Sequence, residues 1–236
     1  MGKYNLKKLC LIFALVVSIN SLVIASEKEE TGHGGAHHSE EGVTPDAALG
    51  RLKEGNKRYT SFNFGNKDWK AKLEEVYNGQ KPYAIILSCS DSRVAPEYIF
   101  DAGLGEIFII RTAGNVVDPV VLGSIEYAVA HLGSKLLIVM GHEKCGAVTA
   151  AVNHASESAN ISAILNEIKP SVDIIEKSGD KENLTERAIL ENANAMAKKV
   201  TEGSQVISDL VKEGKFKIIS AKYFLKDGRV EFLEGK

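Results

Sequence analysis

Three short, continuous runs of apolar residues constrain the fold more than any other feature of this sequence. They occupy residues 83–87, 107–110 and 136–140. Continuous apolar runs, unlike alternating ones, are typical of strands that are covered on both faces. Between the second and third runs, Asp118 and the proline after it begin an apolar helical stretch that ends near Gly133. Because a strand, a helix and a strand in this order form a crossover, the sequence predicts a parallel sheet.

Further helices and a hairpin are predicted around these strands. The predicted helices cover roughly residues 44–59, 68–77 and 182–212. Two strand-like segments, 216–225 and 229–233, are joined by a turn sequence that ends in Gly228, which predicts a hairpin. The expected fold class is therefore α/β, with a mostly parallel β-sheet flanked by helices and a C-terminal antiparallel hairpin.

Residues 1–25 have the pattern of a secretory signal peptide. Three lysines precede an apolar segment at residues 9–19, and small residues suit a cleavage site after Ala25. A retained membrane anchor is the alternative, but Ser18 and Asn20 interrupt the apolar segment, which is also short for a span. We therefore expect an exported protein with no membrane attachment after cleavage, periplasmic in a cell that has an outer membrane.

Residues 26–42 connect this segment to the rest of the chain and are rich in Glu, Gly and His. Almost none of these residues is apolar enough to bury, so we expect a disordered linker. Its clustered histidines could collect metal, but a solvated linker with incidental affinity is the favoured interpretation. A single globular domain is expected over residues 43–236.

Two cysteines and a histidine fall where an α/β fold gathers ligands. Cys89 and His142 lie just beyond two of the predicted strands, at the carboxyl edge of the sheet. Cys145 follows three residues after His142, where a turn entering a helix can aim both side chains at one point. Two thiolates and one imidazole form a zinc ligand set that leaves a fourth position for water. The plain alternative is a disulfide between the two cysteines.

The first of these cysteines begins the sequence Cys89-Ser-Asp-Ser-Arg93. It places an acid, Asp91, and a guanidinium, Arg93, directly after a candidate metal ligand. An isolated pair of this kind is most simply a salt bridge. Beside an open zinc site, the same pair can take part in catalysis.

Three motifs together resemble the beta-class carbonic anhydrases. They are Cys89-Ser-Asp-Ser-Arg93, Arg111-Thr-Ala-Gly-Asn115 and Gly141-His-Glu-Lys-Cys-Gly146, in this order and spacing. The resemblance covers roughly residues 44–233. It implies an enzyme, a zinc lyase that catalyses the reversible hydration of CO2 to bicarbonate and a proton.

The resemblance also implies roles for individual residues. Cys89, His142 and Cys145 are expected to hold Zn2+, with one ion per subunit. Asp91, fixed by Arg93, is expected to accept a hydrogen bond from the zinc-bound hydroxide and to orient it toward CO2. An aspartate held by arginine keeps a depressed pKa and stays an acceptor.

Four further residues correspond to the family's substrate pocket. Gln80 lies nine residues before Cys89, at the position of an amide that binds bicarbonate, and Gly146 can offer a backbone N–H. Phe108 and Tyr127 correspond to aromatic residues that line the pocket, although both could equally be core residues. The family assembles as dimers or multiples of dimers with pocket residues drawn across the interface, so a homodimer is the smallest expected assembly.

Two other functions remain open at this point. Relatives on the same scaffold hydrolyse CS2 or COS with identical ligands, although the intact Asp91 and Arg93 pair and Gln80 favour bicarbonate chemistry. The His-rich segment would also suit a non-enzymatic, exported zinc-binding protein. The formal net charge of −2 lacks the basic excess of a nucleic-acid-binding protein, so the expected partners are CO2 and bicarbonate.

Overall fold

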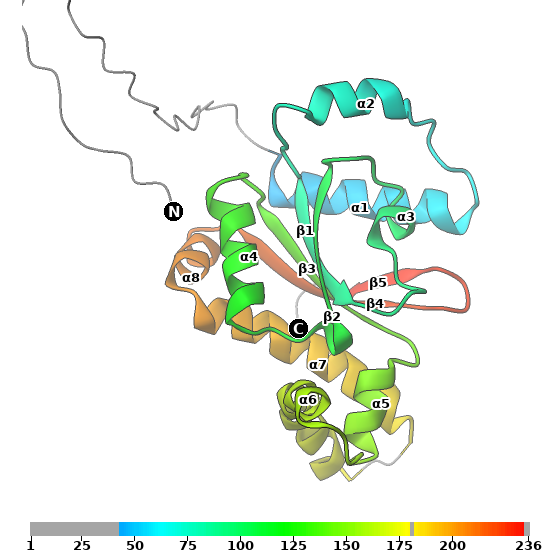
Figure 1. Ribbon diagram of the computed structural model, residues 1–236, viewed down its shortest axis with the longest axis vertical. Helices are drawn as coiled ribbons and strands as arrows, with labels where there is room; N and C mark the ends of the chain where they lie inside the picture. Colours follow the sequence, from blue (N-terminus) through cyan, green and yellow to red (C-terminus); the bar gives the residue numbers. More distant parts are fainter. Residues whose placement is uncertain (1–42, 180–181, 234–236) are drawn as a thin grey trace, which may run out of the picture. The chain divides into compact units, whose positions relative to one another are not determined.

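The computed structural model describes residues 43–179 and 182–233. The predicted signal peptide and linker, residues 1–42, lie outside the described residues. Within the described ranges, no helix combines the length and apolar character needed to cross a membrane. A five-stranded sheet with helices on both faces forms the domain (Figure 1).

The sheet confirms the predicted fold class. Its strands are β1 (Ala84–Cys89), β2 (Ile107–Thr112), β3 (Leu136–His142), β4 (Lys217–Tyr223) and β5 (Val230–Leu233). They lie in the order β2-β1-β3-β4-β5, with parallel pairing from β2 to β4 and antiparallel pairing between β4 and β5. Every residue of β1 and β3 is buried, as their continuous apolar sequences predicted.

Helices cover both faces of this sheet. They are α1 (Pro45–Thr60), α2 (Trp69–Val76), α3 (Pro96–Ile99), α4 (Pro119–Ala130), α5 (Gly146–Val152), α6 (Ala159–Lys177), α7 (Leu184–Gly203) and α8 (Gln205–Lys212). Three begin close to the predicted helix starts, where the side chains of Thr44, Asp68 and Asp118 each accept a backbone N–H from the first turn.

Two stretches differ from the expectation. The helical region predicted over residues 182–212 is two helices, because Ser204 adopts an extended conformation that ends α7. Its Oγ then accepts the N–H of Ile207 at 3.2 Å and begins α8. Helix α6 was not predicted; it forms despite Pro170 in its interior and buries Ile168 against the core.

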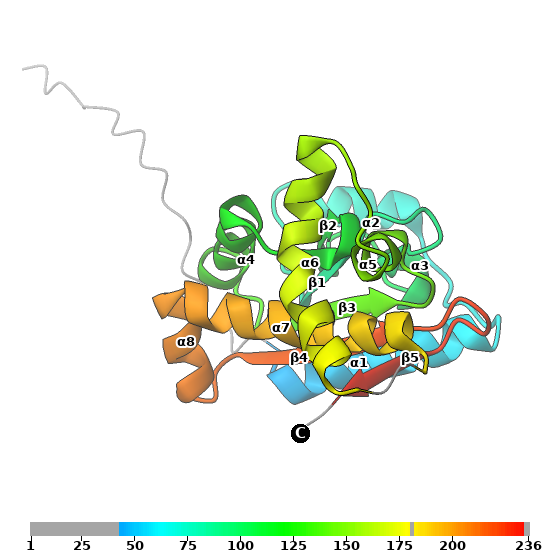
Figure 2. The same cartoon turned by 90° about the horizontal axis from the view of Figure 1, so that it is seen from below.

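The core has two halves, one on each face of the sheet. Ile85 and Leu87 of β1 pack with residues of α4, α5, α6 and α7. Ala84 and Ile86 face the other way and pack with residues of α1 and α3. Successive side chains of a β-strand point to opposite faces of the sheet, which explains this alternation. Figure 2 shows the sheet from below, with α7 on one side of it and α1 on the other. Cys89 continues the first set, so its side chain points toward the α7 face.

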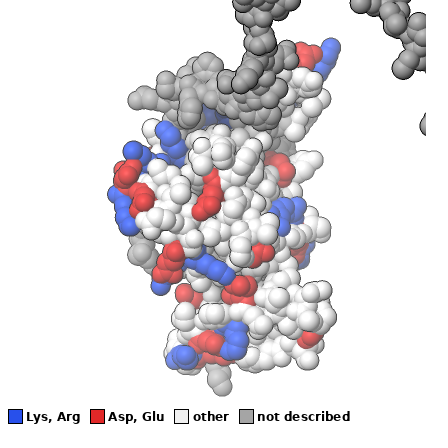
Figure 3. Space-filling model, turned by 60° about the vertical axis from the view of Figure 1, so that its left-hand side comes forward, with Lys and Arg blue, Asp and Glu red and all other residues white. Residues whose placement is uncertain are grey.

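Acidic and basic side chains are interspersed on the face seen in Figure 3. Across the described residues, opposite charges form local ion pairs, such as Lys169 with Asp173 and Lys212 with Asp209. On that face, the described residues form no continuous basic area of the kind that would track a phosphate backbone.

Candidate active site

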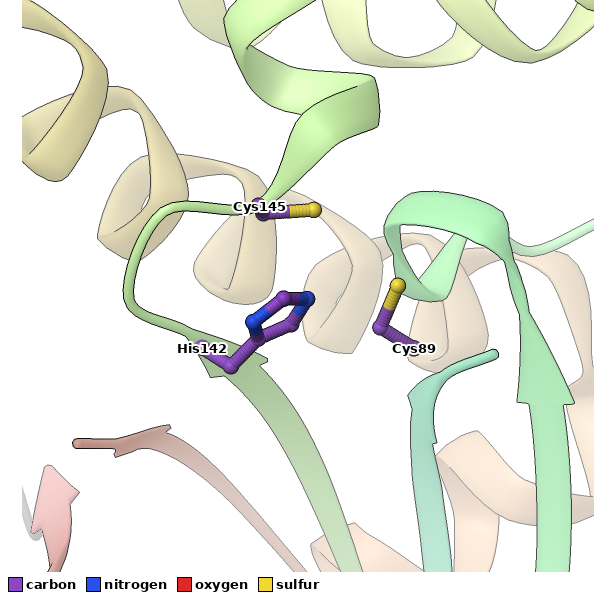
Figure 4. Close-up of side chains that lie close together, drawn as sticks. All are labelled: Cys89, His142 and Cys145. Atoms are coloured by element: carbon purple, nitrogen blue, oxygen red, sulfur yellow. The ribbon is translucent and has the colours of Figure 1, made fainter. Parts of the chain in front are cut away.

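The carboxyl ends of β1 and β3 bring the three predicted metal ligands together (Figure 4). Because the two strands are neighbours and parallel, Cys89 and His142 at their ends lie on the same edge of the sheet. Cys145 immediately precedes α5, three residues after His142. One ligand atom from each residue lies within 4.8 Å of the other two, and all three residues are buried. Residues far apart in the sequence thus converge on one point.

The orientation of His142 leaves one ring nitrogen available to a metal. Nδ1 lies 2.9 Å from the carbonyl oxygen of Glu143, and since this oxygen can only accept, Nδ1 carries the proton. Nε2 has no hydrogen-bond partner among the described residues, although His142 is 0% exposed. A buried nitrogen without a partner is costly unless something binds it. Two thiols beside this imidazole complete a donor set that fits zinc.

The two thiols influence each other's pKa in opposite directions. A hydrogen bond from Cys145 lowers the pKa of Cys89, and the N–H of Gly114, 3.3 Å from the Cys89 sulfur, acts in the same direction. The same thiol–thiol hydrogen bond, together with burial, raises the pKa of Cys145. A metal cation held by Cys89 and Cys145 would displace the remaining thiol proton, so that both residues could bind it as thiolates. Cys89 and Cys145 are not joined in a disulfide.

Asp91 is held beside these ligands by Arg93. Arg93 Nε donates to Oδ1 of Asp91 at 2.9 Å, and Nη2 donates to Oδ2 at 2.6 Å. The Arg93 side chain is the main reason that the pKa of Asp91 lies well below its ordinary value. Oδ2 is 3.9 Å from Nε2 of His142. Asp91 therefore presents an ionised acceptor next to the point where the ligands converge.

Arg111 fastens the same loop from the neighbouring strand, a role that was not predicted from the sequence. Its Nε donates to the carbonyl oxygen of Cys89 at 3.1 Å, and its Nη2 donates to that of Asp91 at 2.7 Å. These bonds fix the backbone on which a candidate ligand and the acceptor are carried. The sequence signal that could have indicated this role is the position of Arg111, which begins a motif directly after a predicted strand.

The four predicted substrate-binding residues lie in two places. Gly146 follows Cys145 directly and begins α5, so it lies at the ligand site. Phe108 pairs with Ile85, four residues before the end of β1. That offset corresponds to about 13 Å along the strand from the ligand end of the sheet.

Gln80 and Tyr127 lie near the same end of the sheet as Phe108, the end at which β2 begins. The rings of Tyr127 and Phe108 are 6.5 Å apart, and Tyr127 is 49% exposed. Gln80 is exposed and lies beside Gly105, just before β2 begins. Within one chain these three residues therefore gather near the start of β2, away from the ligands, and their role in substrate binding stays a prediction.

Comparisons with known proteins identify the family. A family model described as carbonic anhydrase matches residues 84–230, and carbonic anhydrase 2 of Mycobacterium tuberculosis is 38% identical over 197 residues, covering 79% of this chain and 92% of that protein. The solved structure of the beta-carbonic anhydrase CcaA matches with a TM-score of 0.65 at 25% identity, covering 80% of this chain and 92% of that one. The chain belongs to the beta-class carbonic anhydrases. The beta-carbonic anhydrase CafA of Aspergillus fumigatus is similar too, with a TM-score of 0.63 at 25% identity over 80% of this chain and 90% of that one.

This carbonic anhydrase is thus an enzyme of CO2 hydration, a lyase that interconverts CO2 and bicarbonate. Carbonic anhydrases use zinc, and the cluster of Cys89, His142 and Cys145 fits the zinc site of a beta-class enzyme.

Proposed function

We propose that this carbonic anhydrase hydrates CO2 at one zinc ion per subunit, held by Cys89, His142 and Cys145. The observation that carries the proposal is the buried Nε2 of His142, which lies beside two thiols and has no hydrogen-bond partner in the described part of the chain. When bound, zinc supplies Lewis-acid activation of a water molecule, so that hydroxide is available near neutral pH.

Asp91 orients the attacking oxygen in this proposal. With its pKa held down chiefly by Arg93, the carboxylate does not take up the proton itself and acts as a hydrogen-bond acceptor. An acceptor fixed at Oδ2 directs a lone pair of the attacking oxygen toward the carbon of CO2. The new C–O bond gives bicarbonate, and the proton of the water molecule is released to solvent.

We further propose that a second subunit completes the substrate pocket. β2 is an outer strand, and its free edge has no strand partner within the described residues. A two-fold axis that pairs two such edges antiparallel would place the start of one β2 beside the end of the other. Gln80, Phe108 and Tyr127 of one subunit would then lie near the partner's zinc ligands.

Stopped-flow measurement of CO2 hydration by the purified mature chain tests the activity. We expect catalysis that a chelator removes and that one equivalent of zinc per subunit restores. Turnover of CS2 or COS in preference to CO2 would support the alternative hydrolase. A protein that binds zinc and turns over none of the three gases would be the non-enzymatic zinc-binding protein.

Native and denaturing mass spectrometry of the protein recovered from its cells tests three finer proposals together. Cleavage after Ala25 predicts a mature chain that begins at Ser26 and is found in the periplasmic fraction. The native mass should correspond to a dimer or a multiple of dimers, with one zinc ion per subunit. A chain that still begins at Met1 would contradict cleavage of the signal peptide. A monomer would contradict the proposed dimer, and a different zinc ratio would contradict one ion per subunit.

A further inference from the structure

One face of α7 contacts the backbone of both ligand-bearing loops. The residues on this face are Glu186, Ile189, Asn192 and Met196, which we call the α7 stripe. Their spacing of three or four positions places them along one side of a helix. Neither the hydration mechanism proposed above nor any motif uses these residues.

Glu186, at the start of the stripe, holds the loop between His142 and Cys145. Its Oε1 accepts the backbone N–H of Lys144 at 3.1 Å, and its Oε2 lies 2.6 Å from Nζ of Lys222. The Lys222 side chain is only 9% exposed and that of Glu186 is 33% exposed, so this ion pair is partly shielded from water. Lys144 has a φ of 53°, a left-handed conformation that a lysine adopts only when its surroundings hold it there.

Ile189, one turn further along, packs against the strand end that precedes His142. A Cβ atom added to Gly141 would lie 2.8 Å from Cγ2 of Ile189 and 3.2 Å from its carbonyl oxygen. Only glycine allows this approach of α7 to β3. The backbone on which His142 is carried therefore rests directly on the stripe.

Asn192 reaches the other ligand loop. Its Nδ2 donates to the carbonyl oxygen of Gly114 at 2.8 Å, and the N–H of Gly114 donates to the Cys89 sulfur at 3.3 Å. Asn192 is 0% exposed, so this hydrogen bond is fully enclosed. One turn further on, the Met196 sulfur accepts the N–H of Val117 at 3.3 Å, which fixes the same loop a second time.

We propose that the α7 stripe positions the zinc ligands, and that Glu186 and Asn192 are positioning residues that set how firmly the ion is retained. The inference rests on the proposed zinc site. Glu186 acts on the spacing between His142 and Cys145, and Asn192 acts on the hydrogen bond to Cys89. Outer partners of this kind typically change metal affinity by about 10–100-fold when they are removed.

The test is the rate at which zinc leaves the loaded, full-length protein for a chelator in excess. We expect Glu186→Ala, which removes the acceptor of the Lys144 N–H, and Asn192→Leu each to release zinc at least about tenfold faster than the parent. In cobalt-substituted protein, the thiolate-to-cobalt absorption bands should shift in both variants. Glu186 is partly exposed, so its variant keeps the test decisive if Asn192→Leu does not fold.

Two control variants separate positioning from general destabilisation. Val200→Ala creates a core defect on the same helix, one turn beyond Met196, and Glu167→Ala removes the ion pair of Lys199 that joins α7 to α6. Both should release zinc at the parent rate. Parent-like release and spectra in Glu186→Ala, or equally fast release in Val200→Ala, would overturn the inference. A parent protein that holds no zinc would instead overturn the proposed function.

Discussion

Replacing Cys89 or Cys145 by serine is expected to remove most of the zinc and nearly all CO2 hydration. A serine hydroxyl stays neutral where a thiolate is needed, and it is a poor ligand for this soft-ligand site. In the proposed site each cysteine is one of three protein ligands, and both are buried, so loss of either sulfur leaves two of the three. We expect activity to fall by more than about 100-fold, beyond the effect of losing an outer partner. Zinc content per subunit and stopped-flow rates measure both effects.

Ser88→Ala is the matched control for these variants. Ser88 precedes Cys89 on β1, is 0% exposed, and its hydroxyl has no hydrogen-bond partner among the described residues. Loss of this hydroxyl should leave the zinc content per subunit and the CO2 hydration rate unchanged. Full zinc and the parent rate in either cysteine variant would contradict the ligand assignment. Thiol titration of the denatured, metal-stripped mature protein without reductant should find two free thiols, whereas a disulfide would leave none.

The fold and the ligand cluster could be predicted because each depends on a local pattern with one structural consequence. A continuous apolar run of five residues suits a strand covered on both faces, and the carboxyl ends of parallel strands meet at one edge. Cys89 and His142 each lie just beyond such a run, so their convergence follows once the two strands pair as parallel neighbours. Cys145 follows His142 so closely that a single turn brings it to the same point.

The supporting residues could not be predicted in the same way. Glu186 and Asn192 lie inside an ordinary amphipathic helix, and their importance depends on which way α7 crosses the sheet. The same limit applies to Gln80, Phe108 and Tyr127. The resemblance to the family predicted that they line the substrate pocket, but in a single chain they lie away from the ligand end of β1. Which pocket they line depends on how two chains associate.

Asp91→Asn is expected to keep zinc and lose most of the hydration rate. Asparagine is close in size to aspartate, but it can present an N–H where an acceptor is needed, and it loses the charge that Arg93 binds at two points. Removing one fixed electrostatic partner of a reacting group typically slows turnover by about 100-fold or more. Arg93→Ala should do similar harm, because Asp91 would keep its charge but lose its orientation. Zinc content and stopped-flow rates, measured on the same samples, separate the two effects.

Asp173→Asn supplies the matched control, since it makes the same change in a carboxylate paired with Lys169 on α6, outside the ligand cluster. It should hydrate CO2 at the parent rate. The pKa of Asp91 is depressed, so its carboxylate is ionised at every pH above that low value, and the deficit of Asp91→Asn should persist across neutral and alkaline pH. A deficit that disappears as pH rises would mean that Asp91 acts by taking up a proton. A fully zinc-loaded Asp91→Asn enzyme with the parent rate would reduce the pair with Arg93 to a structural salt bridge.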